Sequence, residues 1–307
     1  MGFLTGLKAN KAYRLQKSGQ AEEAVKIYEE AFAEGLNDPR YILAYAQLII
    51  RKGEYQKAKD FLVKHQKAPG MTPDQRVTLL VDYAVCCFRL GDLDKGINTL
   101  EQQFRKTETG LLYQTLGYLY VEKYDAANKP EFPTEDEPAG AERSAESEEA
   151  EGAENTAQAE EIAEDSASGN AEPARQPEEA TVSAATGEKQ LSPREAWDAG
   201  AEKAEAFIRD SLDYDDADPI CLDNMGQVLY RVRGDRAGAK KWFKKALAIK
   251  DSQIDTLYFM SKYDEEAGDR QAALEKLEKA AGGRFSPLNY CSRETVQNEI
   301  ERLKGAV

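Results

Sequence analysis

Hydrophobic and small residues recur along this chain at steps of three and four positions, the spacing that places them on one face of a helix. The segment 222–247 shows this most clearly, with one stripe on either side of the pair Gly234-Asp235. The large positions are Leu222, Met225, Leu229 and Phe243, and the small ones are Gly226, Ala239 and Ala246. Small residues let helices approach closely, so the pattern predicts two amphipathic helices joined by a turn at Gly234.

The same arrangement returns at a fixed distance along the chain. Gly19 and Gly53 near the N-terminus are as far apart as Gly234 and Gly268. This interval lies within the range of roughly 20 to 50 positions that is typical of stacked structural repeats. A further unit turns at Gly91, at a slightly longer interval after Gly53. Five units thus share one rule of spacing, which indicates stacked helical repeats rather than a single globular core.

These positions resemble the tetratricopeptide repeat family, whose small and large positions they match over nearly all of the chain outside one acidic stretch. The resemblance implies an all-α fold, a right-handed α-solenoid of about six helix pairs with a concave inner surface. At the C-terminal end, Ser286-Pro287 has the pattern of a helix start, and Val296, Ile300 and Leu303 form a single apolar stripe. We therefore expect a capping helix over Ser286–Leu303.

One repeat is interrupted by an insertion. Residues 112–121 have the pattern of a first helix, but the pattern of its partner begins only at Glu195. We expect residues 1–124 to hold three helix pairs and the first helix of the fourth, and residues 125–190 to form the insertion. Residues 191–307 are then expected to hold the second helix of the fourth pair, two further pairs and the cap.

The insertion carries the net charge of the molecule. The chain has a formal charge of -15, and residues 125–190 contain 19 Asp and Glu against 4 Lys and Arg, which leaves 37 of each sign elsewhere. With Phe132 as its only aromatic residue, the insertion cannot bury enough apolar surface to offset the entropy of ordering, so we expect disorder. It is either a tolerated low-complexity expansion or an acidic arm that recruits a basic partner or competes for the groove.

The balanced charge of the remaining chain argues against nucleic acid as a partner, because phosphate binding needs a clustered excess of Lys and Arg. No apolar run reaches the roughly 18 residues of a membrane helix, and the first residues lack the pattern of a signal peptide. We therefore expect a cytoplasmic protein with neither nucleic acid nor a membrane as its partner. The cysteines are expected to be buried thiols, at Cys86, Cys87, Cys221 and Cys291.

Few residues suggest catalysis. The single histidine, His65, stands in a predicted second helix without Cys or His at metal-ligand spacing, which favours a structural role. The repeated Gly-Asp pairs are explained as turns between helices and not as a phosphate-binding loop. We expect no enzymatic activity, no cofactor or metal, and no small-molecule substrate.

The resemblance implies that the first helix of each pair lines the concave surface. Projected from the small buried positions, the inner residues are Leu43, Gln47, Ile50, Val81, Val85, Phe88, Gln114, Tyr118, Val121, Asp223, Gln227 and Tyr230. They would form an apolar and aromatic groove with amide donors, suited to a helix or an extended peptide of a partner protein. The alternative is that they only fill a tightly wound inner core.

The sequence therefore favours a protein-protein interaction scaffold that binds a partner peptide in this groove. The second candidate is a regulatory or assembly protein whose acidic arm recruits a basic partner or inhibits the groove.

Overall fold

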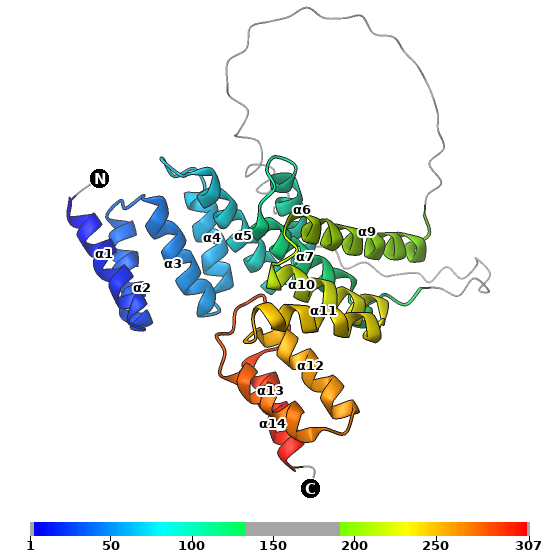
Figure 1. Ribbon diagram of the computed structural model, residues 1–307. Helices are drawn as coiled ribbons and strands as arrows, with labels where there is room; N and C mark the ends of the chain where they lie inside the picture. Colours follow the sequence, from blue (N-terminus) through cyan, green and yellow to red (C-terminus); the bar gives the residue numbers. More distant parts are fainter. Residues whose placement is uncertain (1–2, 133–190, 306–307) are drawn as a thin grey trace, which may run out of the picture.

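The computed structural model describes residues 3–132 and 191–305, and these residues are mostly helical (Figure 1). The first six helices are α1 (Phe3–Lys17), α2 (Ala21–Ala33), α3 (Pro39–Arg51), α4 (Tyr55–His65), α5 (Pro73–Arg89) and α6 (Leu93–Phe104). The central helices are α7 (Gly110–Tyr124), the short η1 (Ala126–Asn128), α9 (Pro193–Tyr214), α10 (Pro219–Gln227), the π-helix η2 (Val228–Arg233) and α11 (Arg236–Ile249). The last are α12 (Ile254–Glu266), α13 (Arg270–Ala281) and α14 (Arg293–Gly305).

Successive helices pack as pairs: α1 with α2, α3 with α4, α5 with α6, α7 with α9, α10 with α11, and α12 with α13. The helix α14 packs on α13 at the C-terminal end. The predicted fold class, an all-α solenoid of about six helix pairs with a capping helix, is confirmed over the described residues.

The helix starts follow from local sequence. Thr72 caps α5 by accepting from the backbone N–H of Gln75, whose side chain accepts in return from the Thr72 N–H. Ser192 and Glu195 form the same reciprocal pair at the start of α9. Each capping residue satisfies backbone donors that a helix leaves open, and each is followed by a proline at the first helical position.

The turns within five of the pairs depend on glycine. The repeat glycines take φ angles between 69° and 86°, a left-handed conformation that other residues adopt only with strain, at Gly19, Gly53, Gly91, Gly234 and Gly268. The regular spacing of glycines in the sequence is therefore the spacing of one backbone turn repeated along the solenoid.

Glycines inside helices mark the closest approaches between neighbouring elements. A Cβ atom at Gly226 of α10 would lie 2.4 Å from the ring of Phe243 on α11. A Cβ atom at Gly117 of α7 would lie 2.8 Å from the Asn224 amide on α10. These contacts hold α7, α10 and α11 together at the centre of the molecule.

The fourth pair joins segments that are far apart in the sequence. The ring of Phe207 on α9 lies 5.3 Å from the rings of Tyr113 and Tyr120 on α7, and Trp197 lies 5.3 Å from Tyr124. The disorder predicted for the acidic insertion concerns residues 133–190, which lie outside the described residues.

Asp125, counted with the acidic insertion on the basis of sequence, belongs to the folded structure. Its side chain is buried, caps η1 by accepting from the Ala127 N–H, and pairs with Arg231 of η2 at 2.7 Å. The π-helical turn carries this arginine toward the end of α7, where Glu122 is its second partner at 2.8 Å.

The start predicted for the capping helix is wrong. The helix α14 begins at Arg293, not at Ser286, because the Ser286 N–H donates to the side chain of Asn289 and the chain stays non-helical as far as Ser292. Ser292 then acts as the cap, accepting from the Thr295 N–H at 3.0 Å. The stripe of α14 is buried as expected, at Val296, Ile300 and Leu303.

Figure 1 shows how the pairs are arranged in space. The pairs from α1 to α6 form one arm, α7, α9, α10 and α11 lie at its end, and α12 to α14 form a second arm that extends below them. The connection between α13 and α14, drawn in orange and red, rises into the bend between the two arms. This bend contains the candidate functional site.

Candidate functional site

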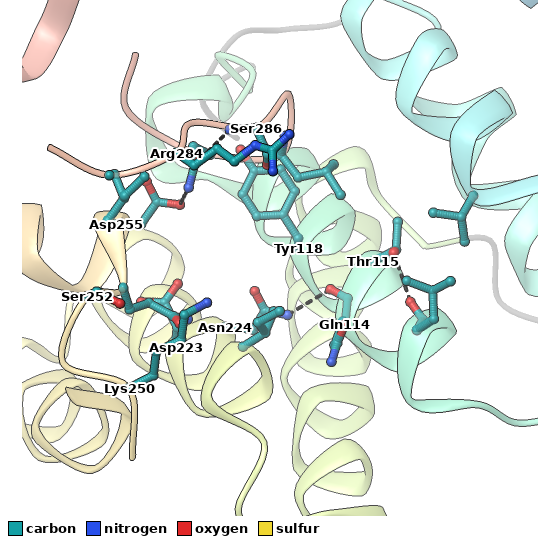
Figure 2. Close-up of a pocket in the computed structure, with 18 residues that line it drawn as sticks. Gln114, Thr115, Tyr118, Asp223, Asn224, Lys250, Ser252, Asp255, Arg284 and Ser286 are labelled. Atoms are coloured by element: carbon teal, nitrogen blue, oxygen red, sulfur yellow. Dashed lines mark hydrogen bonds between the residues drawn. The ribbon is translucent and has the colours of Figure 1, made fainter. Parts of the chain in front are cut away.

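A cavity of about 510 Å³ lies in the bend. Its walls come from α5, α7, α10, α12 and the connection after α13, and Figure 2 shows their side chains pointing into a common space. Four of the predicted groove residues line it, namely Val81, Gln114, Tyr118 and Asp223. Residues from helices that are distant in the sequence thus meet in one hollow.

The other predicted groove residues lie outside this cavity. Tyr230 lines a second cavity of about 380 Å³, together with Tyr258, Phe259 and Tyr290. The remaining seven lie outside both cavity walls: Leu43, Gln47, Ile50, Val85, Phe88, Val121 and Gln227.

Burial separates the twelve predicted residues into two groups. The buried ones are Ile50, Val81, Val85, Tyr118, Val121, Asp223 and Gln227. The half-buried ones are Leu43, Gln47, Phe88, Gln114 and Tyr230. Val121 and Gln227 are fully enclosed, so packing explains them without a ligand. Gln114 and Tyr230 combine a cavity wall with partial exposure and are the better candidates for contact with a partner.

A chain of polar contacts connects the cavity to η2. The Gln227 amide donates to Asp223 at 2.7 Å and accepts from Arg231 at 2.8 Å, and Arg231 continues to Asp125 and Glu122. All five side chains are largely buried, and each contact satisfies a group that would be costly to leave unpaired. The network fixes the position of Asp223 in the cavity wall.

Two neighbouring carboxylates belong to the cavity wall. Burial, and next the nearby carboxylate of Asp255, raise the pKa of Asp223 well above its usual range. Burial also raises the pKa of Asp255, although this carboxylate accepts from the backbone N–H groups of Tyr290 and Cys291 at 3.1 and 3.3 Å. The wall is therefore lined with hydrogen-bonding carboxyl groups that are fixed in place.

The rim of the cavity is apolar and was missed by the prediction from sequence. Leu111 of α7 and Ile220 of α10 line the cavity and are 37% and 36% exposed. Both belong to first helices of a pair, three positions before Gln114 and Asp223 of the predicted set. The inner positions were projected from the small buried residues of each first helix. The same projection, continued by one helical turn toward the start of α7 and α10, includes Leu111 and Ile220.

Two charged residues of α5 were also missed. Asp82 contacts the Gln47 amide, and its second oxygen is buried with no hydrogen-bond partner among the described residues. Arg89 donates to the backbone carbonyl of Pro287, which lies near the other end of the chain. An acidic residue within the apolar run 77–88 was the available signal for Asp82, whereas the role of Arg89 depends on a contact that no local pattern contains.

The reactive side chains occupy packed positions. The His65 ring lies 5.4 Å from Phe32 and 4.4 Å from Phe61, and burial lowers its pKa. The four cysteines are buried and free, as predicted, and burial raises the pKa values of Cys86 and Cys221 to about 12. These thiols are thus held in their unreactive, protonated form.

Within residues 3–132 and 191–305, no group of His, Cys, Asp and Glu is arranged to hold a metal ion. Among the helices of the same ranges, none has the combination of length and apolar composition that crossing a bilayer requires.

Comparison with protein families gives a match between residues 17–103 and the family described as anaphase-promoting complex, cyclosome, subunit 3. A sequence comparison with curated proteins finds no match.

Solved structures share the fold. A thermophilic tetratricopeptide repeat protein of Thermus thermophilus has a TM-score of 0.53 at 14% identity, covering 87% of this chain and 99% of its own. PilW, a type IV pilus biogenesis factor, has a TM-score of 0.52 at 12% identity, with 94% and 98% covered. A chain of the APC/C hetero-tetramer Cut9-Hcn1 has a TM-score of 0.52 at 12% identity, covering 94% of this chain and 40% of its own.

Proposed function

We propose that this chain, which shares the fold of tetratricopeptide repeat proteins, acts as a protein-interaction scaffold that binds a peptide segment of its partner at the cavity between α5, α7, α10 and α12. The role proposed is binding and not catalysis. The observation that carries the proposal is the composition of this cavity: an exposed apolar rim around a floor of amides and carboxylates. Apolar rims supply binding energy, and fixed polar groups supply direction.

The cavity fits a peptide better than a small molecule. It is about 510 Å³ in volume, open to solvent at the rim, and supported by a floor whose hydrogen bonds are already made within the protein, such as Asn224 to the Gln114 carbonyl at 2.9 Å. An aliphatic side chain of the partner would contact Leu111 and Ile220, while its backbone would meet the half-buried side chain of Gln114 in the cavity wall.

A displayed peptide library offers a direct test, because it can be screened before the partner is identified. Peptides selected on the full chain are expected to bind the wild type, and the double variant Leu111→Arg/Ile220→Arg should lose at least about tenfold in affinity, measured by calorimetry. Both residues are partly exposed, so the fold should tolerate the change.

The matched control is Ile249→Arg, since Ile249 is 51% exposed and lies on α11 outside the cavity. The control should bind as the wild type does. Selection of no peptide, or of peptides that bind the double variant and the wild type alike, would contradict the proposal.

A further inference from the structure

The connection between α13 and α14 differs from the other connections between repeats. It runs over residues 282–292 and is longer than each of the described connections between the other pairs, which have four to seven residues. It does not loop outward but rises into the bend, where Leu288 packs against the N-terminal hydrophobic core (Figure 1). A segment near the C-terminus thus lies on the surface that the first helices present.

This segment is held mainly through its backbone. The Arg89 guanidinium donates to the carbonyl of Pro287 at 2.7 Å and to that of Asn289 at 3.4 Å. On the other side, the Asp255 carboxylate accepts from the Tyr290 backbone N–H at 3.1 Å and from the side-chain amide of Asn289 at 3.0 Å. Backbone hydrogen bonds of this kind are how a groove holds an extended peptide of varied sequence.

Two side chains of the segment are received by apolar or aromatic surfaces. Leu288 packs against the N-terminal core, and Tyr290 stacks on Phe259 with the ring centres 5.0 Å apart. The opposite contact of Tyr290 is the Arg231 guanidinium, 4.1 Å from its ring centre. Alternate side chains are thus anchored while the backbone between them is held by Arg89 and Asp255, as in peptide recognition between two proteins.

The segment leaves empty space on the surface that it covers. It borders the 510 Å³ cavity through Arg284, Ser286, Leu288 and Asn289, and it borders the 380 Å³ cavity through Tyr290. Tyr290 is still 41% exposed. Protein interiors are close-packed with few voids, so a segment flanked by two cavities is a poorer fit than a permanent part of a core.

We propose that residues 284–290 are a resident occupant of the partner's binding surface, and that a partner peptide of the same chemistry binds by displacing them. The inference rests on the proposed function. The partner segment is extended, with an aliphatic side chain two positions before an aromatic one and free backbone carbonyls for Arg89. The volume of the two cavities leaves room for larger side chains than Leu288 and Tyr290, which would favour the partner over the resident segment.

The first test supplies the resident segment as a separate molecule. A fluorescein-labelled synthetic peptide of residues 284–292 is titrated with the wild-type chain and with the triple variant Leu288→Gly/Asn289→Ser/Tyr290→Gly, and binding is followed by anisotropy. The variant should bind at least about tenfold more tightly, because in the wild type the tethered segment competes at high effective concentration.

A peptide in which Leu288 is replaced by Asp should not bind the variant. The matched control chain is Ile249→Ser, which changes an exposed residue outside the surface and should bind the peptide as weakly as the wild type does. Equal affinity of the triple variant and the wild type, or binding to neither, overturns the proposal.

The second test uses the unaltered chain, so it stands even if the triple variant fails to fold. Hydrogen exchange of fragments that cover residues 282–292 is measured with and without a peptide selected from the displayed library. Exchange should become faster in fragments that cover residues 288–291 when the selected peptide is added, because the Tyr290 and Cys291 N–H groups bonded to Asp255 are released.

The two tests distinguish a failure of the displacement proposal from a failure of the proposed scaffold function. If a selected peptide binds in a manner that depends on Leu111 and Ile220 while exchange at residues 288–291 stays slow, displacement is wrong and the scaffold function stands. If no peptide is selected, the proposed function fails, and the anisotropy experiment with residues 284–292 alone decides whether the surface accepts this segment.

Discussion

Asp82 is a residue whose surroundings conflict with its charge. Burial raises its pKa to about 7, the Gln47 amide and Arg51 act in the opposite direction, and one carboxyl oxygen has no hydrogen-bond partner in the described part of the chain. Arg284 faces Arg51 from the connection after α13, and Cys86 stands one helical turn away from Asp82 on α5. The surroundings of Asp82 therefore favour the neutral form of its carboxyl group over the charged form.

This environment predicts a pH dependence of stability. The folded pKa is raised above the ordinary value of about 3.9, so between about pH 4 and pH 7 the folded state binds more protons than the unfolded state, and stability falls as the pH rises. Asp82→Asn removes the charge at similar size. Its free energy of unfolding should exceed that of the wild type at pH 8 and approach it at pH 5, measured by urea denaturation.

The control for this prediction is Asp216→Asn, an exposed carboxylate in the turn between α9 and α10. The difference between this control and the wild type should not change with pH. A stability difference for Asp82→Asn that is the same at pH 5 and pH 8 would show that the carboxyl is well solvated.

Individual residues also set the limit of what could be predicted. Some features depend only on local spacing along the chain, and these could be predicted from the sequence. They are the repeat glycines, the small positions in the helices and the burial of the cysteines. Residues whose role depends on a distant contact, such as Arg89 with Pro287, leave no local pattern. Of the predicted groove, Val81, Gln114, Tyr118 and Asp223 meet at one cavity, while the other positions were projected from helical spacing that cannot tell an inner face from an open one.

At the scale of elements, η2 combines a π-helical turn with a buried ion-pair cluster. The π-helical turn over Val228–Arg233 widens the end of the first helix of the fifth pair and directs Arg231 at Glu122 and Asp125 of the fourth. Insertions of this kind inside α-helices often mark functional sites. Here the turn also supports Tyr290, whose ring lies over the same guanidinium.

The ion-pair cluster predicts a strong effect of Arg231→Met. The substitution would leave two carboxylates largely buried without a cation, which typically costs about 3–5 kcal/mol of folding free energy. The free energy of unfolding, measured in urea at pH 7, should fall by this amount. Raising the salt concentration should not restore it, because buried pairs are screened little.

Arg209→Met is the comparison within the same region. Arg209 pairs with Glu205 on the surface of α9, and its side chain is 56% exposed. Exposed pairs contribute about 0–1 kcal/mol, so this variant should be nearly as stable as the wild type. Similar losses for the two substitutions would mean that the buried cluster is weaker than its geometry indicates.

The connection after α13 shows why element boundaries were harder to predict than element type. Ser286-Pro287 has the local pattern of a helix start, but Asn289 and Asp255 accept the N–H groups that a first helical turn would leave open. Asp255 lies on another helix, well before Tyr290 in the chain. The prediction of a helix was right because the apolar stripe at Val296, Ile300 and Leu303 can be seen in the local sequence. The predicted start was wrong because the competing acceptor, Asp255, lies far away in the sequence.

For the whole molecule, the insertion interrupts one helix pair without separating its helices. Lys203 of α9 pairs with Glu101 of α6 at 3.2 Å, and aromatic rings of α7 and α9 lie 5.3 Å apart. The contacts that hold the fourth pair are thus made by residues on both sides of residues 133–190. Loop-closure entropy grows only with the logarithm of loop length, so the length between the helices has a small effect on stability.

Replacing residues 134–188 by a Gly-Ser linker of about ten residues is therefore expected to leave the fold intact. The thermal midpoint should stay the same or rise by a few degrees, and the circular dichroism of the helices should be preserved. Binding of a library-selected peptide is the second readout, since it separates the groove from the acidic arm. Loss of this binding in the shortened chain would assign recognition to the acidic residues.

The pairing of α7 with α9 also has a consequence for the order of events on the ribosome. The first three helix pairs can fold as soon as they emerge, but α7 ends at Tyr124 and must wait for a partner that begins only at Pro193. At roughly 5–20 residues per second, translation reaches α9 only several seconds later. During that interval the apolar face of α7, including Leu112, Leu116 and Leu119, has only the preceding pair to cover it. A nascent chain of this length is therefore the stage at which the protein most needs a chaperone.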